Sequence, residues 1–367
     1  MVHIKFLAII FVVTIFLSGC GFKDIDNRIF VTGIGIDPSE KENGKYRITL
    51  KLAIPVSQIK QEKEASYQYL VHEGENLEEA IRILETHTDK VLDFGHAKII
   101  LINESLLEEE LKDFMDYLVR RGDIQFIAWI AAAKPTAEEI LRTEPKGESP
   151  VASPLIKFFG NTGTESPYIV STYLYEFRRD FFGKGVDSIL PVVESNETGT
   201  QLIVNKSVIV KEKTKPLELS SSFTRDFNSL SNSIPGYSFK ITTDGLNLVL
   251  NMGTTKMKYK IMKENGQPTS IKINVKMSGV ISQSNKNLSL KNLENYNKLA
   301  SKEIKKELEK LFTTLQKEKL DPFGFGLRYR TMQLNHKDTF KKWEEAYPTL
   351  PFDVTVDVAL KSTGTIE

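Results

Sequence analysis

Cysteine and tryptophan are scarce in this chain of 367 residues, which contains one Cys and two Trp. A single cysteine excludes a disulfide within the chain, so its domains must hold together by packing. An excess of charge of either sign is also missing, because 49 Lys and Arg balance 48 Asp and Glu. Without a basic excess to neutralise phosphates, we expect no nucleic-acid partner and no binding to anionic lipid by charge alone.

Complete motifs for catalysis, cofactors and metals are missing as well. Gly33-Ile34-Gly35 is a fragment of a dinucleotide-binding loop, but Pro38 holds the third glycine position, which indicates ordinary strand glycines. His87 and His96 are too far apart to share a helix face, and no second pair of ligands accompanies them. No hydrolase nucleophile motif is present. We therefore predict no catalytic residue, no cofactor, no metal ion and no enzymatic activity.

The N-terminus is the most informative segment. Residues 6–16 form an apolar run that is typical of a secretory signal peptide and shorter than the ~20 residues that cross a bilayer. The next residues, Leu17-Ser18-Gly19-Cys20, resemble the bacterial lipobox. We expect cleavage between Gly19 and Cys20, and Cys20 to carry an S-diacylglycerol and an N-acyl chain such as palmitate. The alternatives are a plain secretory signal with a chance cysteine and an uncleaved membrane anchor.

Strands and helices alternate in the first half of the mature chain. Residues 29–37 and 45–54 predict an antiparallel pair with one buried face and one face in water. Asn76 is the predicted N-cap of a helix over 76–90. The apolar stripe of that helix is Leu77, Ala80, Ile81 and Leu84.

Further along, Asn103 is predicted to cap a second helix. The continuously apolar segment 124–133 predicts a central strand, and Pro135 is expected at the first position of a helix over 136–142. This alternation predicts an α/β arrangement with helices on both sheet faces.

The pattern changes after a polar segment at 192–200, where we place the main boundary. Alternating residues around 257–261 and 271–277 predict strands that show one face to solvent. Asn265-Gly266 is a turn signal between them, within a connection that we expect to exceed two residues. Residues 292–319 form the clearest predicted helix, whose narrow apolar stripe favours packing on the C-terminal sheet over docking of a partner helix.

Two shorter segments complete this half. Gly324-Phe325-Gly326 follows the long helix and is interpreted as its termination and a tight turn. Residues 340–346 predict a short helix, and alternation over 352–360 predicts a final strand.

Together these elements predict a mixed α/β or α+β protein of several domains, with mixed and antiparallel sheets flanked by helices. We expect about three domains after the signal peptide. The expected division is a signal peptide at 1–19, a lipidated tether at 20–28, an N-terminal α/β region of two subdomains at 29–196, and a C-terminal α/β domain at 197–367.

Two groups of side chains could bind a ligand, although a structural role is the preferred interpretation of each. Asp24 and Asp26 could form a metal-binding pair but are more typical of a solvated tether. Several aromatic residues could line an apolar pocket or docking surface, but core packing is the commoner role: Phe158-Phe159, Phe181-Phe182, Phe323 and Phe325.

Four motifs follow the lipobox cysteine in a fixed order. They are Val31-Thr32-Gly33-Ile34-Gly35-Ile36-Asp37, Gly185-Val186-Asp187-Ser188-Ile189-Leu190-Pro191, Asp321-Pro322-Phe323-Gly324-Phe325-Gly326, and Val354-Thr355-Val356-Asp357-Val358 with Gly364 beyond it. Their order and spacing resemble the Ger(x)C family, the C subunits of spore germinant receptors. Phe22 departs from the family, in which many members carry Trp at a similar position.

The resemblance implies a non-catalytic protein of three α/β domains, including a C-terminal domain typical of the family. It implies a lipid anchor on the outer face of the spore inner membrane in an endospore-forming bacterium. It also implies two membrane partners, the receptor A and B subunits, which act with the C subunit in nutrient-triggered germination. Cys20 is the one site residue that carries over from the family.

A lipid-anchored solute-binding protein of a transporter is the main alternative. Such proteins usually have two lobes built on parallel sheets, and the alternating strands around Tyr259 and Val275 argue against that architecture. An anchored hydrolase is a third possibility, but it lacks any nucleophile–base constellation. The sequence leaves open whether the chain binds a small molecule directly.

Overall fold

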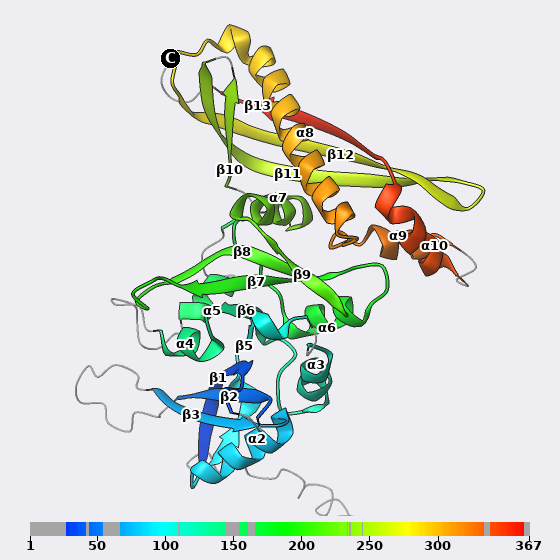
Figure 1. The fold of residues 1–367 in the computed structure, drawn as a ribbon. Coiled ribbons are helices and arrows are strands. Elements are labelled where there is room, and N and C mark those ends of the chain that lie inside the picture. The colour runs from blue at the N-terminus through cyan, green and yellow to red at the C-terminus, as the bar shows by residue number, and fades with distance from the viewer. Residues whose placement is uncertain are drawn as a thin grey trace, which may run out of the picture.

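The computed structural model describes residues 27–362 except 42–43, 54–66, 109–110, 144–153, 161–165, 233, 235, 244 and 334–337. A nine-stranded mixed sheet and a four-stranded sheet organise the described chain, and helix α7 (Ser221–Asn232) lies between them (Figure 1). Mixed and antiparallel sheets flanked by helices confirm the predicted fold class. No helix in the described part of the chain is long and apolar enough to cross a membrane.

Parallel strands form the centre of the nine-stranded sheet, and antiparallel hairpins form its two edges. Its strands are β1 (Arg28–Pro38), β2 (Tyr46–Ala53), β3 (Tyr67–Gly74), β4 (Val91–Asp93), β5 (Ile99–Asn103), β6 (Trp129–Lys134), β7 (Ser188–Ser195), β8 (Leu202–Lys211) and β9 (Thr214–Leu219). The order is β3-β2-β1-β5-β6-β7-β8-β9, with β4 paired to the start of β1. The boundary expected at residue 196 lies between β7 and β8, which pair within this sheet.

Helices cover both faces of this sheet. The larger core holds α2 (Leu77–Leu84), α3 (Leu111–Arg120) and α6 (Leu174–Phe182) on one face, and a second core holds α4 (Ala137–Arg142) and α5 (Pro154–Phe159) on the other. Asn76 caps α2 as predicted, since its side chain accepts a hydrogen bond from Glu79 N (2.9 Å). Parallel strands need such crossover helices, and the predicted α/β arrangement is confirmed.

The face of β1 and β2 that we expected in water is instead buried. Thr49 and Lys51 are buried there, and Lys51 Nζ donates to the carbonyl of Leu141 in α4 (3.0 Å). Gly33 and Gly35 lie beneath the same helix, and a Cβ on Gly33 would come 2.8 Å from Leu141 Cδ2. These glycines are strand residues, as predicted, and their missing side chains let α4 approach the sheet closely.

The strand predicted over 124–133 forms only in its second half, because β6 begins at Trp129. The residues before it form a turn in which Ala128 N donates to the Gln125 carbonyl (3.0 Å). This turn leaves Phe126 and Ile127 exposed. Apolar composition alone therefore overestimated the strand.

Pro135 does not occupy the first position of α4. Thr136 is the N-cap of that helix, so Pro135 precedes the cap. A second cap comes from Asp37 at the end of β1, whose carboxylate accepts hydrogen bonds from Ala137 N (2.7 Å) and Glu138 N (2.9 Å). The first family motif thus ends on a residue that joins β1 to α4.

The four-stranded sheet contains β10 (Tyr237–Thr243), β11 (Leu246–Glu264), β12 (Gln267–Ser284) and β13 (Phe352–Leu360), in that order. β13 joins parallel to β12, and the other pairs are antiparallel. Helix α8 (Leu293–Lys317) packs on one face, as predicted, and the other face is exposed (Figure 1). The buried stripe of α8 is Ala300, Ile304, Leu308, Leu311, Phe312 and Leu315.

The β11–β12 connection consists of Asn265 and Gly266 alone, so the expectation of a longer connection was wrong. Their φ angles are 51° and 77°. Two consecutive positive φ angles are typical of a type I′ turn, for which Asn-Gly is the preferred pair.

Helix α7 is polar in sequence and yet largely buried, because it packs between the two sheets. The Asn228 side chain donates to the carbonyls of Pro167 (3.1 Å) and Ile169 (2.8 Å), in the segment before α6. On the other side of the helix, Arg225 Nη1 donates to the Ser238 carbonyl in β10 (3.0 Å). Polar contacts of α7 therefore tie the two parts of the chain together.

Candidate functional site

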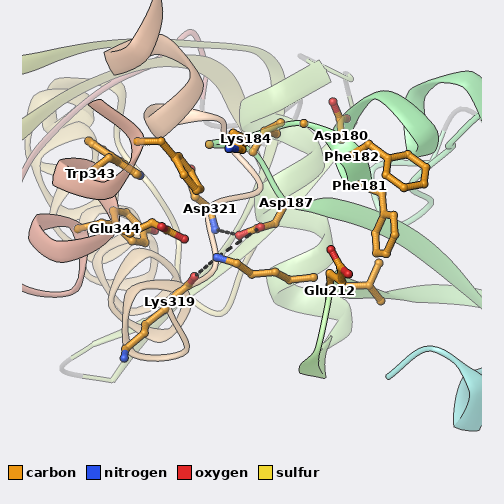
Figure 2. Close-up of a pocket in the computed structure, with 17 residues that line it drawn as sticks. Asp180, Phe181, Phe182, Lys184, Asp187, Glu212, Lys319, Asp321, Trp343 and Glu344 are labelled. Carbon is orange, nitrogen blue, oxygen red and sulfur yellow. Dashed lines mark hydrogen bonds and ion pairs between the residues drawn. The ribbon is translucent and has the colours of Figure 1, made fainter. Parts of the chain in front are cut away.

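Cys20 and Gly19, the site residues predicted from the sequence, lie outside the described residues, as do Asp24 and Asp26. Within the described chain, two of the family motifs meet at the junction of the two sheets (Figure 2). Residues 185–187, just before β7, lie against residues 321–327, just after α8. This contact, here named the motif junction, is the candidate functional site.

Hydrogen bonds donated by backbone N–H groups hold the motif junction together. Asp187 N donates to the Asp321 carbonyl (3.0 Å), and Asp321 N donates to Asp187 Oδ2 (2.6 Å). Leu327 N donates to the Gly185 carbonyl (2.6 Å). These hydrogen bonds join two segments that are far apart in the chain, since 134 residues separate the two aspartates in sequence.

The two segments approach each other so closely at position 185 that only glycine fits there. Its φ is +91°, and a Cβ there would lie 2.5 Å from Gly326 C and from Leu327 N. Both contacts are with backbone, so a side chain could not be accommodated by a rotamer change. Gly326 is also crowded, since a Cβ on it would lie 2.4 Å from Nε1 of the Trp343 side chain.

The segment Gly324-Phe325-Gly326 begins a helix, which corrects our interpretation of it as termination and turn only. Helix α9 (Phe325–Thr331) has Gly324 as its N-cap, in the left-handed conformation. The capping side chain is Asp321, whose carboxylate accepts hydrogen bonds from Phe325 N (3.1 Å) and Gly326 N (2.7 Å). An aspartate three residues ahead of a glycine cap is not a standard start signal, which is why the sequence pattern missed α9.

Asp321 is buried and Asp187 is partly buried. Burial raises the pKa of Asp321 to about 7, although the hydrogen bonds from the backbone of α9 lower it. Burial also raises the pKa of Asp187, although the Lys211 ammonium, 3.7 Å from Asp187 Oδ1, lowers it. The nearby negative charge of Asp187 raises the pKa of Asp321 further. The motif junction therefore contains two carboxyl groups that resist being ionised together.

Hollows flank the motif junction on both sides. One has a volume of about 380 Å³, and Figure 2 shows the lining side chains around Asp187 and Asp321. The other, of about 660 Å³, lies between α6, α7 and α9. The smaller hollow is bordered by Phe181, Phe182, Lys184, Glu212, Trp343 and Glu344.

The smaller hollow has the size and the side chains to hold a ligand. Its volume lies in the range of small-molecule pockets, and ammonium, carboxylate and aromatic groups border it. In the residues that the structure describes, no three His, Cys, Asp or Glu side chains gather to hold a metal ion. The arrangement suits a small polar molecule or a partner's side chain.

A second buried polar cluster links α7, β10 and α8. Arg225 donates to Asp226 Oδ1 (2.8 Å) and to Glu307 Oε1 (2.8 Å), and Tyr237 donates to Asp226 Oδ1 (3.0 Å). Burial raises the pKa of Asp226 to about 7, although the Arg225 charge opposes the shift. Sequence reasoning missed this cluster, because an Arg-Asp pair in a polar segment is typical of a solvated helix face.

The aromatic candidates divide between core and cavity. Phe159 and Phe325 are buried in cores, as expected from the structural interpretation. Phe181 and Phe182 border the smaller hollow, where Phe182 is exposed. Among the histidines, His72 and His87 come together as rings 5.9 Å apart.

Comparison with known proteins covers nearly the whole chain. A family described as "Spore germination protein N-terminal domain" matches residues 21–195, and a family described as "Spore germination B3/ GerAC like, C-terminal" matches residues 206–364. The junction motif at 321–326 therefore lies within the second match, whereas the motif at 185–191 lies within the first.

Curated relatives are similar over their full length. Spore germination protein GerQC of Bacillus cereus is 25% identical over 97% of this chain and 98% of its own. Spore germination protein KC of Bacillus subtilis (strain 168) is 25% identical over 99% of this chain and 97% of its own. The crystal structure of the GerBC protein shares the fold, with a TM-score of 0.58 and 19% identity over 90% of this chain and 97% of that one.

Proposed function

Because this chain belongs to the Ger(x)C family of spore germination proteins, we propose that it is the lipid-anchored C subunit of a germinant receptor. It acts with the receptor A and B membrane subunits in nutrient-triggered germination, on the outer face of the spore inner membrane. Its role is non-catalytic: it holds its partners and passes a conformational signal between them.

The observation that carries this proposal is the pair of adjacent family matches, which together extend from residue 21 to residue 364. The relatives named as spore germination proteins align over at least 95% of their own length, so the likeness is not confined to one shared domain. The lipobox ending at Cys20 supports the anchor, because it directly precedes the first family match.

The motif junction supports a role in signalling. It is the place where the end of one family domain meets the interior of the other, and it is held by polar groups that include the buried Asp321 and the partly buried Asp187. Interfaces between domains of one chain are more polar than obligate interfaces, and relative motion across them is the default expectation. A partner that binds beside the junction can therefore alter how the two parts of the subunit are held.

The anchor is tested in spores whose only nutrient receptor contains this subunit, with Cys20→Ala compared with Ser18→Ala, which keeps a small residue in the lipobox. We expect Cys20→Ala to abolish the nutrient response and to remove the protein from the membrane fraction. Ser18→Ala is expected to leave both unchanged. A trigger that bypasses nutrient sensing should germinate all strains equally.

Two outcomes contradict the proposal. A normal response with the protein still in the membrane fraction overturns the lipid anchor. A normal response with the protein released from the membrane overturns the receptor role. It would favour the alternative of a solute-binding protein of a transporter. The partners are tested separately, by asking whether the A and B subunits co-purify with this chain from detergent-solubilised spore membranes.

A further inference from the structure

The larger of the two hollows beside the motif junction lies between the two parts of the chain and is here named the interdomain hollow. Its volume of about 660 Å³ is within the range of small-molecule sites. On one side its lining comes from α6 and the start of β7, and on the other side from β11 and α9. Ligand sites occur preferentially at such borders between domains.

Apolar side chains from several separate segments line the interdomain hollow without being fully buried. They are Val186, Ile189, Met257, Tyr259, Phe323 and Leu327. The Phe323 ring packs on the buried Phe227 (ring centroids 5.0 Å apart), and the Tyr259 ring packs edge-on against Phe325 (4.8 Å). These contacts fix two aromatic walls, so the hollow offers a preformed apolar surface to a ligand.

Five ionic residues line the interdomain hollow, and four of them are already bonded to neighbours. Arg179 donates two hydrogen bonds to Asp180 (2.7 and 2.9 Å). Glu176 accepts one from the backbone at the start of α6 (3.0 Å), and Asp187 accepts one within the motif junction (2.6 Å). The fifth is the exposed Arg328 of α9, whose side chain has no ion pair or hydrogen bond with any residue that the structure describes. The hollow therefore contains an unpaired positive charge, whereas each lining carboxylate has a partner.

The hydroxyl of Tyr259 lies near this charge. Burial raises the pKa of Tyr259 and the Asp321 charge adds to that effect, whereas the Arg328 charge lowers it. An electrostatic effect of this kind means that the guanidinium and the hydroxyl are close in space. Within the described ranges the Tyr259 hydroxyl has no hydrogen-bond partner either. Two donors, one from β11 and one from α9, are therefore available in the same part of the hollow.

We propose that the interdomain hollow binds a small amphiphilic carboxylate, with its carboxylate on Arg328 and its apolar body against the wall formed by Phe323 and Met257. A guanidinium donates two parallel hydrogen bonds to a carboxylate, and the Tyr259 hydroxyl can donate a third. A cationic ligand is disfavoured, because the lining carboxylates already have partners. This inference goes beyond the proposed function, since it assigns a ligand to the subunit itself. Because both parts of the chain line the hollow, the ligand stabilises one arrangement of them.

The test measures binding of para-fluorophenylpropanoate to the purified full-length protein by fluorine NMR. We expect saturable binding with a dissociation constant in the millimolar range or below, as is usual for a ligand of this size. Para-fluorophenylpropanol and para-fluorophenethylamine should each bind at least about tenfold more weakly, because neither supplies an anion to Arg328. The measurement applies to protein in nanodiscs or free in buffer, with empty nanodiscs as the blank, so it does not depend on the lipid anchor.

Substitutions in the lining locate the ligand. Arg328→Gln is expected to weaken binding at least about tenfold, and Arg328→Lys by a smaller factor, because it keeps the charge. Tyr259→Phe should weaken binding severalfold. Leu327→Trp enlarges a side chain that is 40% exposed at the hollow and should block binding. Arg178→Gln is the matched control, since this exposed arginine of α6 lies outside the lining and should leave the affinity unchanged.

Three results would overturn the inference, with circular dichroism showing that each variant is folded. No saturable binding of the carboxylate up to about 20 mM means that the hollow is not a site for this class of ligand. Equal affinity for the carboxylate and the alcohol contradicts recognition of an anion. Equal affinity in the original chain and in Arg328→Gln places the ligand elsewhere. The membrane anchor and the receptor role are tested separately by Cys20→Ala in spores, so either proposal can fail without the other.

Discussion

Asp321 combines two roles that conflict within one side chain. It caps α9 through hydrogen bonds to Phe325 N and Gly326 N, which favour the ionised carboxylate. It is also fully enclosed, and burial raises its pKa to about 7. Ionised Asp321 therefore destabilises the folded state at high pH. We expect the free energy of unfolding to depend on pH through this residue.

The sign of that response follows from the two pKa values. The unfolded chain ionises Asp321 near pH 4, and the folded chain does so near pH 7. Between these values the folded protein binds more protons, so the free energy of unfolding falls as pH rises, by up to about 1.4 kcal/mol per pH unit. Asp321→Asn should remove this part of the slope between pH 5 and pH 7 in urea unfolding.

The exposed Asp353→Asn is the control for that measurement, because its carboxylate lies on the solvent side of β13. It should leave the slope unchanged. An identical pH dependence in the original chain and in Asp321→Asn would show that the buried carboxyl does not titrate in this range.

Gly185 offers a second test at the scale of one residue. Gly185→Ala adds a Cβ against backbone atoms at 2.5 Å, in a residue whose φ is +91°. Gly199→Ala also places alanine at a positive φ, +63°, but meets nothing within 4 Å. Both substitutions should lower the free energy of unfolding by about 1–2 kcal/mol because of the left-handed conformation. Gly185→Ala should lower it by a further ~1–3 kcal/mol because of the clash.

Denaturant unfolding measures both losses, and limited proteolysis around residues 183–187 reports on the junction itself. Equal destabilisation by the two substitutions would contradict the close pairing of Gly185 with Gly326.

At the scale of the element, α8 shows how a charged helix is fixed by a narrow apolar stripe. Leu308 is fully buried against the four-stranded sheet, whereas Lys302 on the opposite side of the helix faces water. Burial of that stripe, more than helix propensity, stabilises such a helix. The stripe is buried against the sheet of the same subunit, so it is not available for a partner helix.

Leu308→Ala is therefore expected to destabilise the protein by about 2–5 kcal/mol, through lost burial and the cavity left behind. Lys302→Ala should change the free energy of unfolding by less than ~0.5 kcal/mol. Thermal or urea unfolding gives both values. A stable Leu308→Ala protein that fails to bind the membrane subunits would instead assign the stripe to a partner.

At the scale of the whole molecule, polar contacts join two sheets that each have their own core. Separate apolar clusters lie within the nine-stranded and the four-stranded sheets. Between them lie the motif junction and the buried helix α7, and a small apolar cluster joins β8 and β9 to the end of α8. The coupling between the two parts therefore depends on few residues.

Asn228→Ala tests that coupling, since it removes the two hydrogen bonds from α7 to the carbonyls of Pro167 and Ile169. Two buried carbonyls lose their donor, at a cost of about 1–3 kcal/mol each. We expect a single calorimetric transition in the original chain to split into two in the variant. Asn292→Ala, whose exposed side chain makes no capping bond, should keep one transition.

Much of the fold follows from short stretches of sequence. Asn76 with Glu79, the alternation over 352–360 and the stripe of α8 each depend on neighbours a few residues away, and each was predicted correctly. The errors arose where a distant element changed the outcome. Lys51 is buried because α4 crosses the sheet above it, and the apolar segment before Trp129 forms a turn because the start of α6 binds its backbone.

The sequence by itself determined the family of the protein, because the ordered family motifs are local patterns. Only the tertiary structure decided what those motifs do. Asp187 and Asp321 look like two unrelated surface acids in the sequence, and the fold encloses them in one contact across 134 residues. The reason is physical: helix and strand patterns depend on nearby residues, whereas burial, pKa and exposure depend on which elements pack together.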